Sequence, residues 1–259
     1  MSPPEVATAA LRARRREVAR AAGRRRLRLL LSTAGVVAAF VGGLALLHSP
    51  LFAAGSIDVV GARQTGRQAV LDATGLWRHP PLIDLSTATD ERALERLPWV
   101  LRATVTREWP SSVRVVVTER LPVAEVALAG RSRYALVDET GRVLEDTATR
   151  VTGLALVLGA GPVPPPGGWL EPPARAAVAV AGAIPVSLVN AVASVESAWP
   201  GGVRLRLRSG TEVLLGPATQ LREKMVSLAT VLRRVGAAPA APTIVTIDLR
   251  VPSDPVLTS

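Results

Sequence analysis

The sequence predicts a single-pass membrane protein whose remaining part is α+β, with a strand-helix-helix-strand-strand module followed by a mixed, mainly β domain. Three observations support this fold class. An uncharged apolar run lies near the amino terminus, strand and helix periods alternate after it, and short strands separated by turn residues fill the second half. The 259 residues can fill one large or two ordinary domains, and a hydrophobic content of 48% is high for a wholly soluble protein.

The apolar run covers residues 29–47 and reads LLLSTAGVVAAFVGGLALL, without a charged residue. A helix of this length extends about 28 Å, close to the thickness of a bilayer's hydrocarbon core. Residues 1–28 form a basic tail with nine arginines and two glutamates, and the arginines nearest the run are Arg24, Arg25, Arg26 and Arg28. This charge pattern predicts a cytoplasmic amino terminus, one span of the plasma (inner) membrane, and extracytoplasmic domains after it.

Other interpretations of the leader remain open. Ala53-Ala54-Gly55 resembles the cleavage site of a signal peptide, but the apolar run is longer than a typical signal core. A twin-arginine signal fits less well, because Arg28 interrupts the apolar residues that should follow. Clustered arginine also suits nucleic acid, yet the tail has no aromatic residue on which a base can stack. We therefore expect membrane lipid, and no specific nucleic acid, as the partner of the tail.

Residues 48–121 are expected to form the first module with its connector. SIDVVG predicts a strand, residues 65–74 a helix that stops at Gly75, and TDERALERLP a second helix that Pro98 ends. The stretch VTREWPSSVRVVVTER alternates apolar and polar residues on both sides of Pro110-Ser111-Ser112, which predicts a hairpin. By this alternation one face of the first strand, the face of its inward valine, carries Leu101, Ala103, Val105, Arg107 and Trp109. Two helices on one face of three strands make a compact module.

Residues 122–251 are expected to form the second domain, and residues 252–259 an unpatterned tail. The segment includes a hairpin at residues 133–145, a proline-rich linker at 159–173, and strands at 203–208 and 211–215. Arg204, Arg206 and Arg208 alternate with apolar residues and are most simply a solvated face. A helix over 220–234 precedes the last expected strand, TIVTIDLR. A last strand often lies at a sheet edge, where its unpaired N–H and C=O groups can accept a partner strand.

The sequence contains no recognisable catalytic constellation. It has two histidines, no cysteine, and no nucleophile-elbow, phosphate-loop or HExxH motif. Asp138-Glu139 and Glu145-Asp146 flank a predicted turn and are interpreted as solvated hairpin ends. We expect no enzymatic activity, metal, cofactor or small-molecule substrate. A cell-wall enzyme remains a further alternative, and it would need a pocket with convergent carboxylates.

The order of these parts resembles the FtsQ/DivIB family of bacterial division proteins. PWVLRATVTREWPSSVRVVVTERLPVA is similar to the family's POTRA domain, and YALVDETGRVLE, GPATQLREKMVSLATVLRR and TIVTIDLR resemble elements of its second, β domain. The resemblance implies a non-enzymatic scaffold at the division septum. It also implies binding to small bitopic coiled-coil partners of the FtsB and FtsL type and to other divisome components, and a part in regulating septal peptidoglycan synthesis. A POTRA-bearing envelope-assembly factor that captures exported polypeptides is the alternative.

The family's carboxy-terminal edge strand and I/V-D-L-R motif imply the partner-binding residues. Arg250 is the first choice for a charged contact with an acidic partner residue, and the alternative is an ordinary surface arginine. Val251 stands where some relatives have a larger aromatic residue. The full expected set is Thr243, Val245, Ile247, Asp248, Leu249, Arg250 and Val251.

Overall fold

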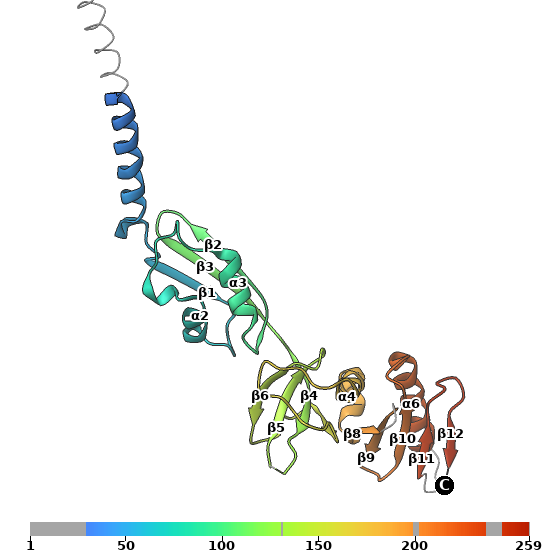
Figure 1. The fold of residues 1–259 in the computed structure, drawn as a ribbon. Helices are drawn as coiled ribbons and strands as arrows, with labels where there is room; N and C mark the ends of the chain where they lie inside the picture. The colour runs from blue at the N-terminus through green and yellow to red at the C-terminus, as the bar shows by residue number, and fades with distance from the viewer. Residues whose placement is uncertain (1–29, 131, 199–201, 237–244, 259) are drawn as a thin grey trace, which may run out of the picture. The chain divides into compact units, whose positions relative to one another are not determined.

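The computed structural model describes residues 30–130, 132–198, 202–236 and 245–258 (Figure 1). The basic residues Arg24, Arg25, Arg26 and Arg28, and also Thr243, lie outside the described residues. The first described element is the helix Leu30–Leu47, whose side chains are exposed. Its length and composition suffice to cross a membrane, and it is the one such helix among the residues that the structure describes. The helix therefore fits a single-pass anchor.

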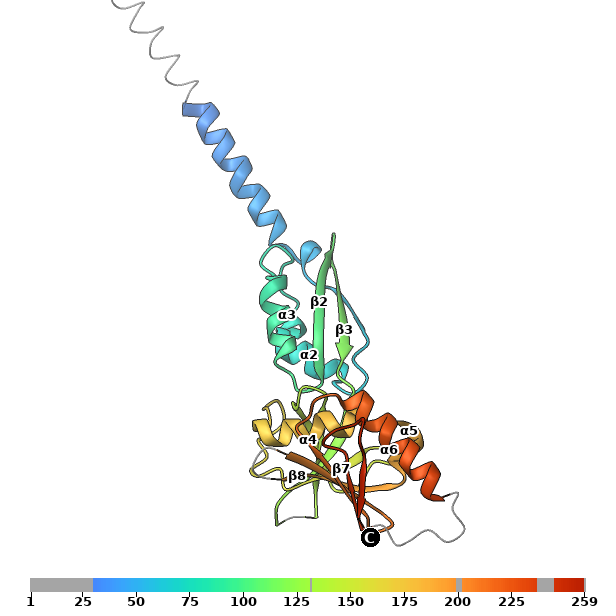
Figure 2. The same cartoon turned by 90° about the vertical axis from the view of Figure 1, so that its right-hand side faces the viewer.

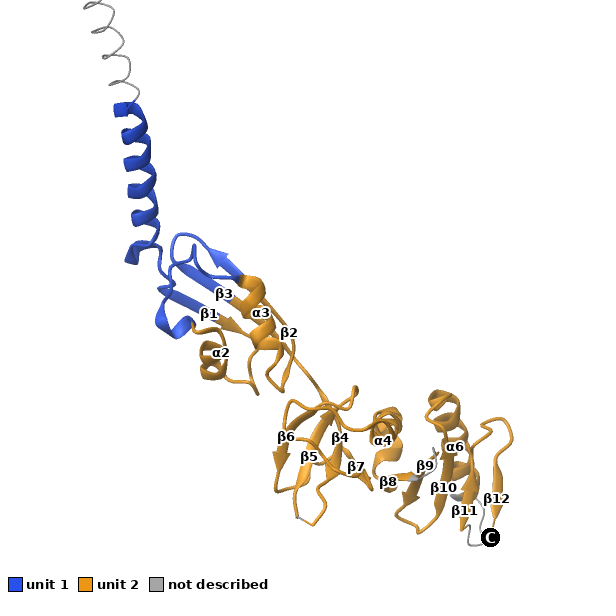
Figure 3. Cartoon of the chain, viewed as in Figure 1, with its two compact units in different colours: residues 1–58, 76–86, 106–114 blue, residues 59–75, 87–105, 115–259 orange. Residues whose placement is uncertain are grey.

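The chain divides into two compact units (Figure 3). Among the described residues, the first holds 30–58, 76–86 and 106–114, and the second holds 59–75, 87–105 and all that follow residue 114. The first unit thus contains the apolar helix, the connector after it and the tip of the predicted hairpin. The second contains the helices of the first module and the whole second domain.

The first module follows the predicted order of strand, helix, helix, strand and strand. Its sheet has the strand order β1-β3-β2, and Figure 2 shows its helices on one face of β2 and β3. The left-handed Gly75 ends the first helix as predicted. The elements are η1 (Pro50–Phe52), β1 (Ser56–Val60), α2 (Arg67–Thr74), η2 (Leu76–Arg78), α3 (Thr87–Glu95), β2 (Val100–Glu108) and β3 (Ser112–Glu119).

The period-two pattern of the hairpin is confirmed in β3, where Val113, Val115 and Val117 are buried between exposed residues. In β2 the pattern is only partly right. Val100 is buried and Leu101 is exposed, so the alternation shifts before the buried Ala103. The predicted inward face also becomes exposed at its far end, and Trp109 keeps 52% of its surface accessible. The strand therefore runs beyond the part of the module that covers its inward face.

The second domain is a nine-stranded sheet with the order β12-β11-β10-β9-β8-β7-β4-β5-β6. Buried residues of α4 and α6 share one hydrophobic core with the inward residues of the strands. The strands are β4 (Pro122–Ala127), β5 (Tyr134–Asp138), β6 (Val143–Thr147), β7 (Ala155–Leu158), β8 (Val192–Ala198), β9 (Gly202–Leu207), β10 (Glu212–Gly216), β11 (Thr246–Asp248) and β12 (Val256–Thr258). The helices are α4 (Pro172–Ala183), α5 (Val186–Val189) and α6 (Leu221–Gly236).

The proline-rich segment expected as a linker is partly bound to the sheet. Val143 donates its N–H to the carbonyl of Gly168 at 2.9 Å, and Gly167 donates to the carbonyl of Val143 at 2.8 Å. Leu170 is buried in the core of the domain. These contacts fix this end of the segment against β6.

The expectation that TIVTIDLR is the last strand and an open edge is wrong. β11 pairs in parallel with β10 through Val213 and Ile247, and on its other side in antiparallel with β12 through Ile247 and Leu257. Residues 252–259 therefore include a strand rather than only a tail. The physical reason is a turn at residues 251–254, where Asp254 donates its N–H to the carbonyl of Val251 at 3.2 Å and sends the chain back along β11.

Candidate functional site at the carboxy-terminal sheet edge

The site begins with β12, which ends the strand order of the second domain. No strand among the described residues pairs with its outer side. Val256 and Leu257 keep 55% and 46% of their surface exposed, and Thr258 is exposed as well. An exposed edge of this kind presents unpaired backbone N–H and C=O groups to another strand. The open sheet edge, which was predicted at residues 243–250, is thus formed by residues 256–258.

Two of the predicted binding residues in β11 and just after it are structural instead. Ile247 and Leu249 are buried in the core. Leu249 also donates its N–H to the carbonyl of Leu214 at 2.8 Å, next to β11 in the sheet. Their side chains cannot meet a partner, because both are buried, and Ile247 also has a paired strand on each side. Val245, in contrast, is exposed.

Arg250 already has a partner within the chain. Its Nη2 lies 2.6 Å from Asp248 Oδ2, its Nε donates to the same carboxylate at 3.0 and 3.1 Å, and its backbone N–H donates to Oδ1 at 2.9 Å. The side-chain hydrogen bond from Arg250 lowers the pKa of Asp248. Both charge-assisted bonds and the turn geometry hold the guanidinium at the end of β11. An acidic partner residue must therefore share Arg250 with Asp248 or replace it.

Gly216 shapes the surface on which Arg250 rests. This glycine ends β10 with a φ of +65°, and a Cβ built on it would lie 3.1 Å from Arg250 Cγ. A side chain here would combine left-handed backbone strain with a close contact. The aliphatic part of Arg250 therefore packs over a position that suits glycine.

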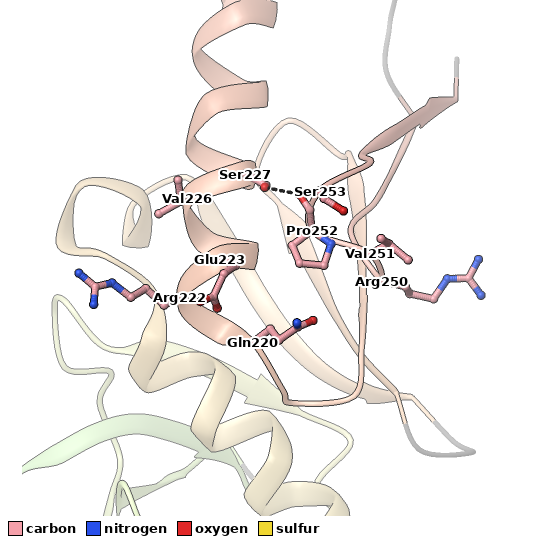
Figure 4. A pocket seen from close by; sticks show the side chains of 9 residues that line it. All are labelled: Gln220, Arg222, Glu223, Val226, Ser227, Arg250, Val251, Pro252 and Ser253. Carbon is pink, nitrogen blue, oxygen red and sulfur yellow. Dashed lines mark hydrogen bonds between the residues drawn. The ribbon is translucent and has the colours of Figure 1, made fainter.

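A hollow of about 610 Å³ lies between the start of α6 and the turn that joins β11 to β12 (Figure 4). Exposed Val226 and Val251 supply apolar surface, while Arg222, Glu223 and Arg250 supply charges. Ser227 Oγ donates to the carbonyl of Pro252 at 2.5 Å, which fastens the turn to the helix. In Figure 4 the side chain of Arg250 points away from α6. The hollow thus adjoins the turn that leads into β12 and has both apolar and charged lining residues.

Arg204 and Arg206, the two arginines of the row that lie in β9, pair with acidic residues on neighbouring strands. Arg204 contacts Glu212 at 2.7 Å and Glu196 at 2.9 Å, and Arg206 contacts Glu196 at 3.4 Å. Arg208 donates to the backbone carbonyl of Asn190. Two of its three members are thus in cross-strand ion pairs on the sheet surface, and the row offers no unbroken positive stripe for a phosphate backbone.

Asp138, interpreted as a solvated hairpin end, is only 3% exposed. Arg120 Nη1 donates to its Oδ2 at 2.6 Å, while the N–H of Arg142 and both the N–H and the hydroxyl of Thr140 donate to Oδ1. Burial on its own raises the pKa of Asp138, but these bonds outweigh it and lower the pKa. Asp138 is a structural carboxylate at the start of the second domain. Among the described residues, no group of three or more His, Cys, Asp and Glu is placed to hold a metal ion.

Comparisons with known proteins match both folded parts of the chain. The family model "POTRA domain, FtsQ-type" matches residues 52–120, and "Cell division protein FtsQ/DivIB, C-terminal" matches residues 127–250. The cell division protein FtsQ of Myxococcus fulvus is 32% identical over 247 residues, which cover 91% of this chain and 84% of that protein. The chain belongs to the FtsQ/DivIB family. It is therefore a cell-division protein with a POTRA domain, and this membership favours the division interpretation over the envelope-assembly factor.

Two further FtsQ relatives are similar over most of this chain. The protein of Corynebacterium glutamicum is 27% identical over 208 residues, covering 80% of this chain and 87% of its own. That of Mycobacterium tuberculosis is 29% identical over 228 residues, covering 85% of this chain and 69% of its own. The match to the carboxy-terminal FtsQ model stops at Arg250, so β12 lies beyond it. The turn residues Pro252-Ser253-Asp254-Pro255 before Val256 are the sequence signal that could have located this strand.

Proposed function

We propose that this FtsQ-family chain is a non-enzymatic scaffold that receives a partner segment by strand addition at β12. The observation that carries the proposal is the outer side of β12, which no strand occupies among the described residues. The proposed partners are small bitopic division proteins of the FtsB and FtsL type, together with other divisome components. The complex would help to regulate septal peptidoglycan synthesis.

The proposed topology places residues 1–28 in the cytoplasm and the span at residues 29–47. The POTRA domain with its connector, residues 48–121, and the β domain from residue 122 then face the cell wall at the division septum. The β domain includes β12, so its proposed boundary moves from residue 251 to the end of the described chain. The helix Leu30–Leu47 supports the span, and the basic composition of the tail supports the orientation.

The register of β11 and β12 indicates how an added strand would meet the domain. Leu257 lies opposite the buried Ile247, so it shares the face of the sheet that carries the core. Val256 lies opposite Asp248 and therefore on the face where Asp248 and Arg250 pair. Alternate side chains of the partner would thus pack on Leu257 and reach towards Val256. An acidic residue in the second set can compete with Asp248 for Arg250.

The neighbouring hollow extends this interface. A partner that continues past the added strand can place an apolar side chain between Val226 and Val251. Arg222 at the start of α6 adds a second positive charge near an acidic partner. We propose that strand pairing supplies most of the affinity, and that this hollow and Arg250 supply specificity.

A matched pair of valine substitutions tests the proposal. Val256→Asp places a charge on the open edge, whereas Val186→Asp makes the same change at an exposed valine of α5. Co-purification of the full chain with the FtsB- and FtsL-type proteins should be lost with the first variant and kept with the second. Leu257→Pro, which removes a strand N–H, should also lose it. Unchanged co-purification with both edge variants would refute strand addition at β12.

A further inference from the structure

The membrane-proximal end of the POTRA domain lies in the same compact unit as the apolar helix (Figure 3). Helix Leu30–Leu47 is followed by the short turn η1, whose last residue is Phe52. The ring of Phe52 meets the ring of Trp109 edge to face, with centroids 6.0 Å apart. Trp109 lies at the turn between β2 and β3, far along the sequence. The hairpin tip therefore lies beside the connector that leaves the proposed span.

Several contacts hold this connector in place. The ring nitrogen Nε2 of His48 lies 3.3 Å from Asp84 Oδ1, and Leu82 donates its N–H to the carbonyl of Phe52 at 2.8 Å. Gly55 donates its N–H to the carbonyl of Ser111 at 2.9 Å. The connector is thus joined both to the loop after η2 and to the hairpin. These bonds keep the hairpin tip near the end of the helix.

The side chains at this end are unusually apolar for exposed positions. Leu51 keeps 69% of its surface exposed and Trp109 keeps 52%. Along β2, Ala103 and Val105 are buried, but Arg107 and Trp109, further along the same predicted face, are exposed. A tryptophan and an arginine beside the end of a span are the residue types that favour a bilayer interface, where the ring lies among headgroups and the cation meets lipid phosphate.

The dimensions agree with contact to the bilayer. A helix of 18 residues extends about 27 Å, nearly the thickness of the hydrocarbon core, so its end lies close to the headgroup layer. Five further residues, three of them in the 3₁₀ turn Pro50–Phe52, advance the chain by at most about 13 Å. Each headgroup layer is about 5–7 Å thick. Phe52, and with it the Trp109 ring, therefore lies within or directly beside this layer.

We propose that Leu51, Phe52, Arg107 and Trp109 form a lipid-contact surface that inserts into the headgroup region of the leaflet where the span ends. The inference rests on helix Leu30–Leu47 crossing the membrane, and it is independent of strand addition at β12. The bilayer thereby holds the POTRA domain at the membrane surface. Lipid is the occupant because the covalent connection to the span brings these side chains to the headgroup layer before any protein partner binds.

Tryptophan quenching by brominated lipids tests this surface. The full chain has five tryptophans, so one variant keeps only Trp109 and a matched variant keeps only Trp169, an exposed tryptophan of the β domain, with phenylalanine replacing the other four. Each is reconstituted in vesicles whose acyl chains carry bromine close to the headgroup. Trp109 should lose emission relative to unbrominated vesicles, while Trp169 should not. Equal emission from Trp109 in both kinds of vesicle overturns the proposal.

Spin labels supply a second measurement that leaves the tryptophans unchanged. The chain has no cysteine, so Leu51→Cys, Leu121→Cys and Val37→Cys each give one labelling site. Leu51 and Leu121 are both exposed leucines, and Val37 lies within the apolar helix. Labels at Leu51 and Val37 should collide mainly with oxygen, which marks them as lipid-embedded. The label at Leu121 should collide mainly with a water-soluble relaxant, which marks it as aqueous. An aqueous label at Leu51 beside an embedded Val37 refutes this inference alone, whereas an aqueous Val37 refutes the span and the inference with it.

Discussion

Replacing Asp138 by asparagine should strongly destabilise the second domain. The carboxylate is buried, and it accepts hydrogen bonds from Arg120, Thr140 and the backbone of Arg142. Asparagine has nearly the same shape but no charge, so the substitution leaves the Arg120 guanidinium, whose side chain is 11% exposed, without its counter-charge. Removing one partner of a buried ion pair typically costs about 3–5 kcal/mol. The corresponding fall in melting temperature is roughly 10 °C or more for a domain of this size.

The assay is urea unfolding of the full chain in detergent, with tryptophan fluorescence as the signal. Glu139→Gln is the matched control, because Glu139 is the adjacent, exposed acid and its loss should change the free energy of unfolding by less than about 0.5 kcal/mol. An Asp138→Asn variant as stable as the control would refute the structural role assigned to this carboxylate.

The pH dependence of the free energy of unfolding is a second test of the role of Asp138. The pKa of Asp138 is lowered in the folded state, so the unfolded chain binds the proton more readily than the folded chain. The stabilisation is therefore complete above the ordinary aspartate pKa and disappears as the pH falls through the lowered folded value. The difference in stability between the wild-type chain and Asp138→Asn should shrink over that acidic range. A difference that stays constant down to low pH would contradict the assignment.

Three further substitutions probe the carboxy-terminal half. Lys224 is buried, which lowers its pKa, and its Nζ donates to the carbonyls of Leu215 and Pro217. The free energy of unfolding should therefore rise with pH between the lowered pKa and the ordinary lysine value, and Lys224→Met should remove this rise in urea titrations. Gly216→Ala should lower the free energy of unfolding by roughly 1–2 kcal/mol, because the backbone there is left-handed. The loss should exceed that of Gly75→Ala, whose added methyl meets open space, and equal losses for the two variants would contradict a role for the contact with Arg250. Leu249→Ala should lower the free energy of unfolding by about 2–5 kcal/mol, and a loss under about 0.5 kcal/mol would contradict its burial.

The first module could be predicted well because its signals are local. The valines at 113, 115 and 117 alternate with polar residues, and Gly75 ends a helix where a left-handed residue is needed. α6 was also predicted closely, since its apolar residues recur at helical spacing and pack in the core. In such segments the periodicity of the sequence and the burial it produces agree.

The features that sequence reasoning missed depend on contacts between distant segments. β12 has three residues, too few to show a period, and it exists because the turn at 251–254 returns the chain to β11. Asp138 lies in a turn sequence that normally faces solvent, but Arg120 buries it through a charge pairing that no local pattern records. Trp109 continues an inward face, although the core ends before it. Tertiary contacts decided each of these three positions.

Hydrogen exchange at β12 tests the central claim most directly. Amide exchange is measured for the full chain alone and in complex with the FtsB- and FtsL-type partners. Exchange of residues 256–258 is compared with exchange of α5, whose Val186 is exposed. Strand addition predicts that partner binding slows exchange in β12, because its outward N–H groups gain acceptors, while α5 is unchanged. A stable complex in which β12 exchanges as fast as in the free chain would contradict the proposed binding edge.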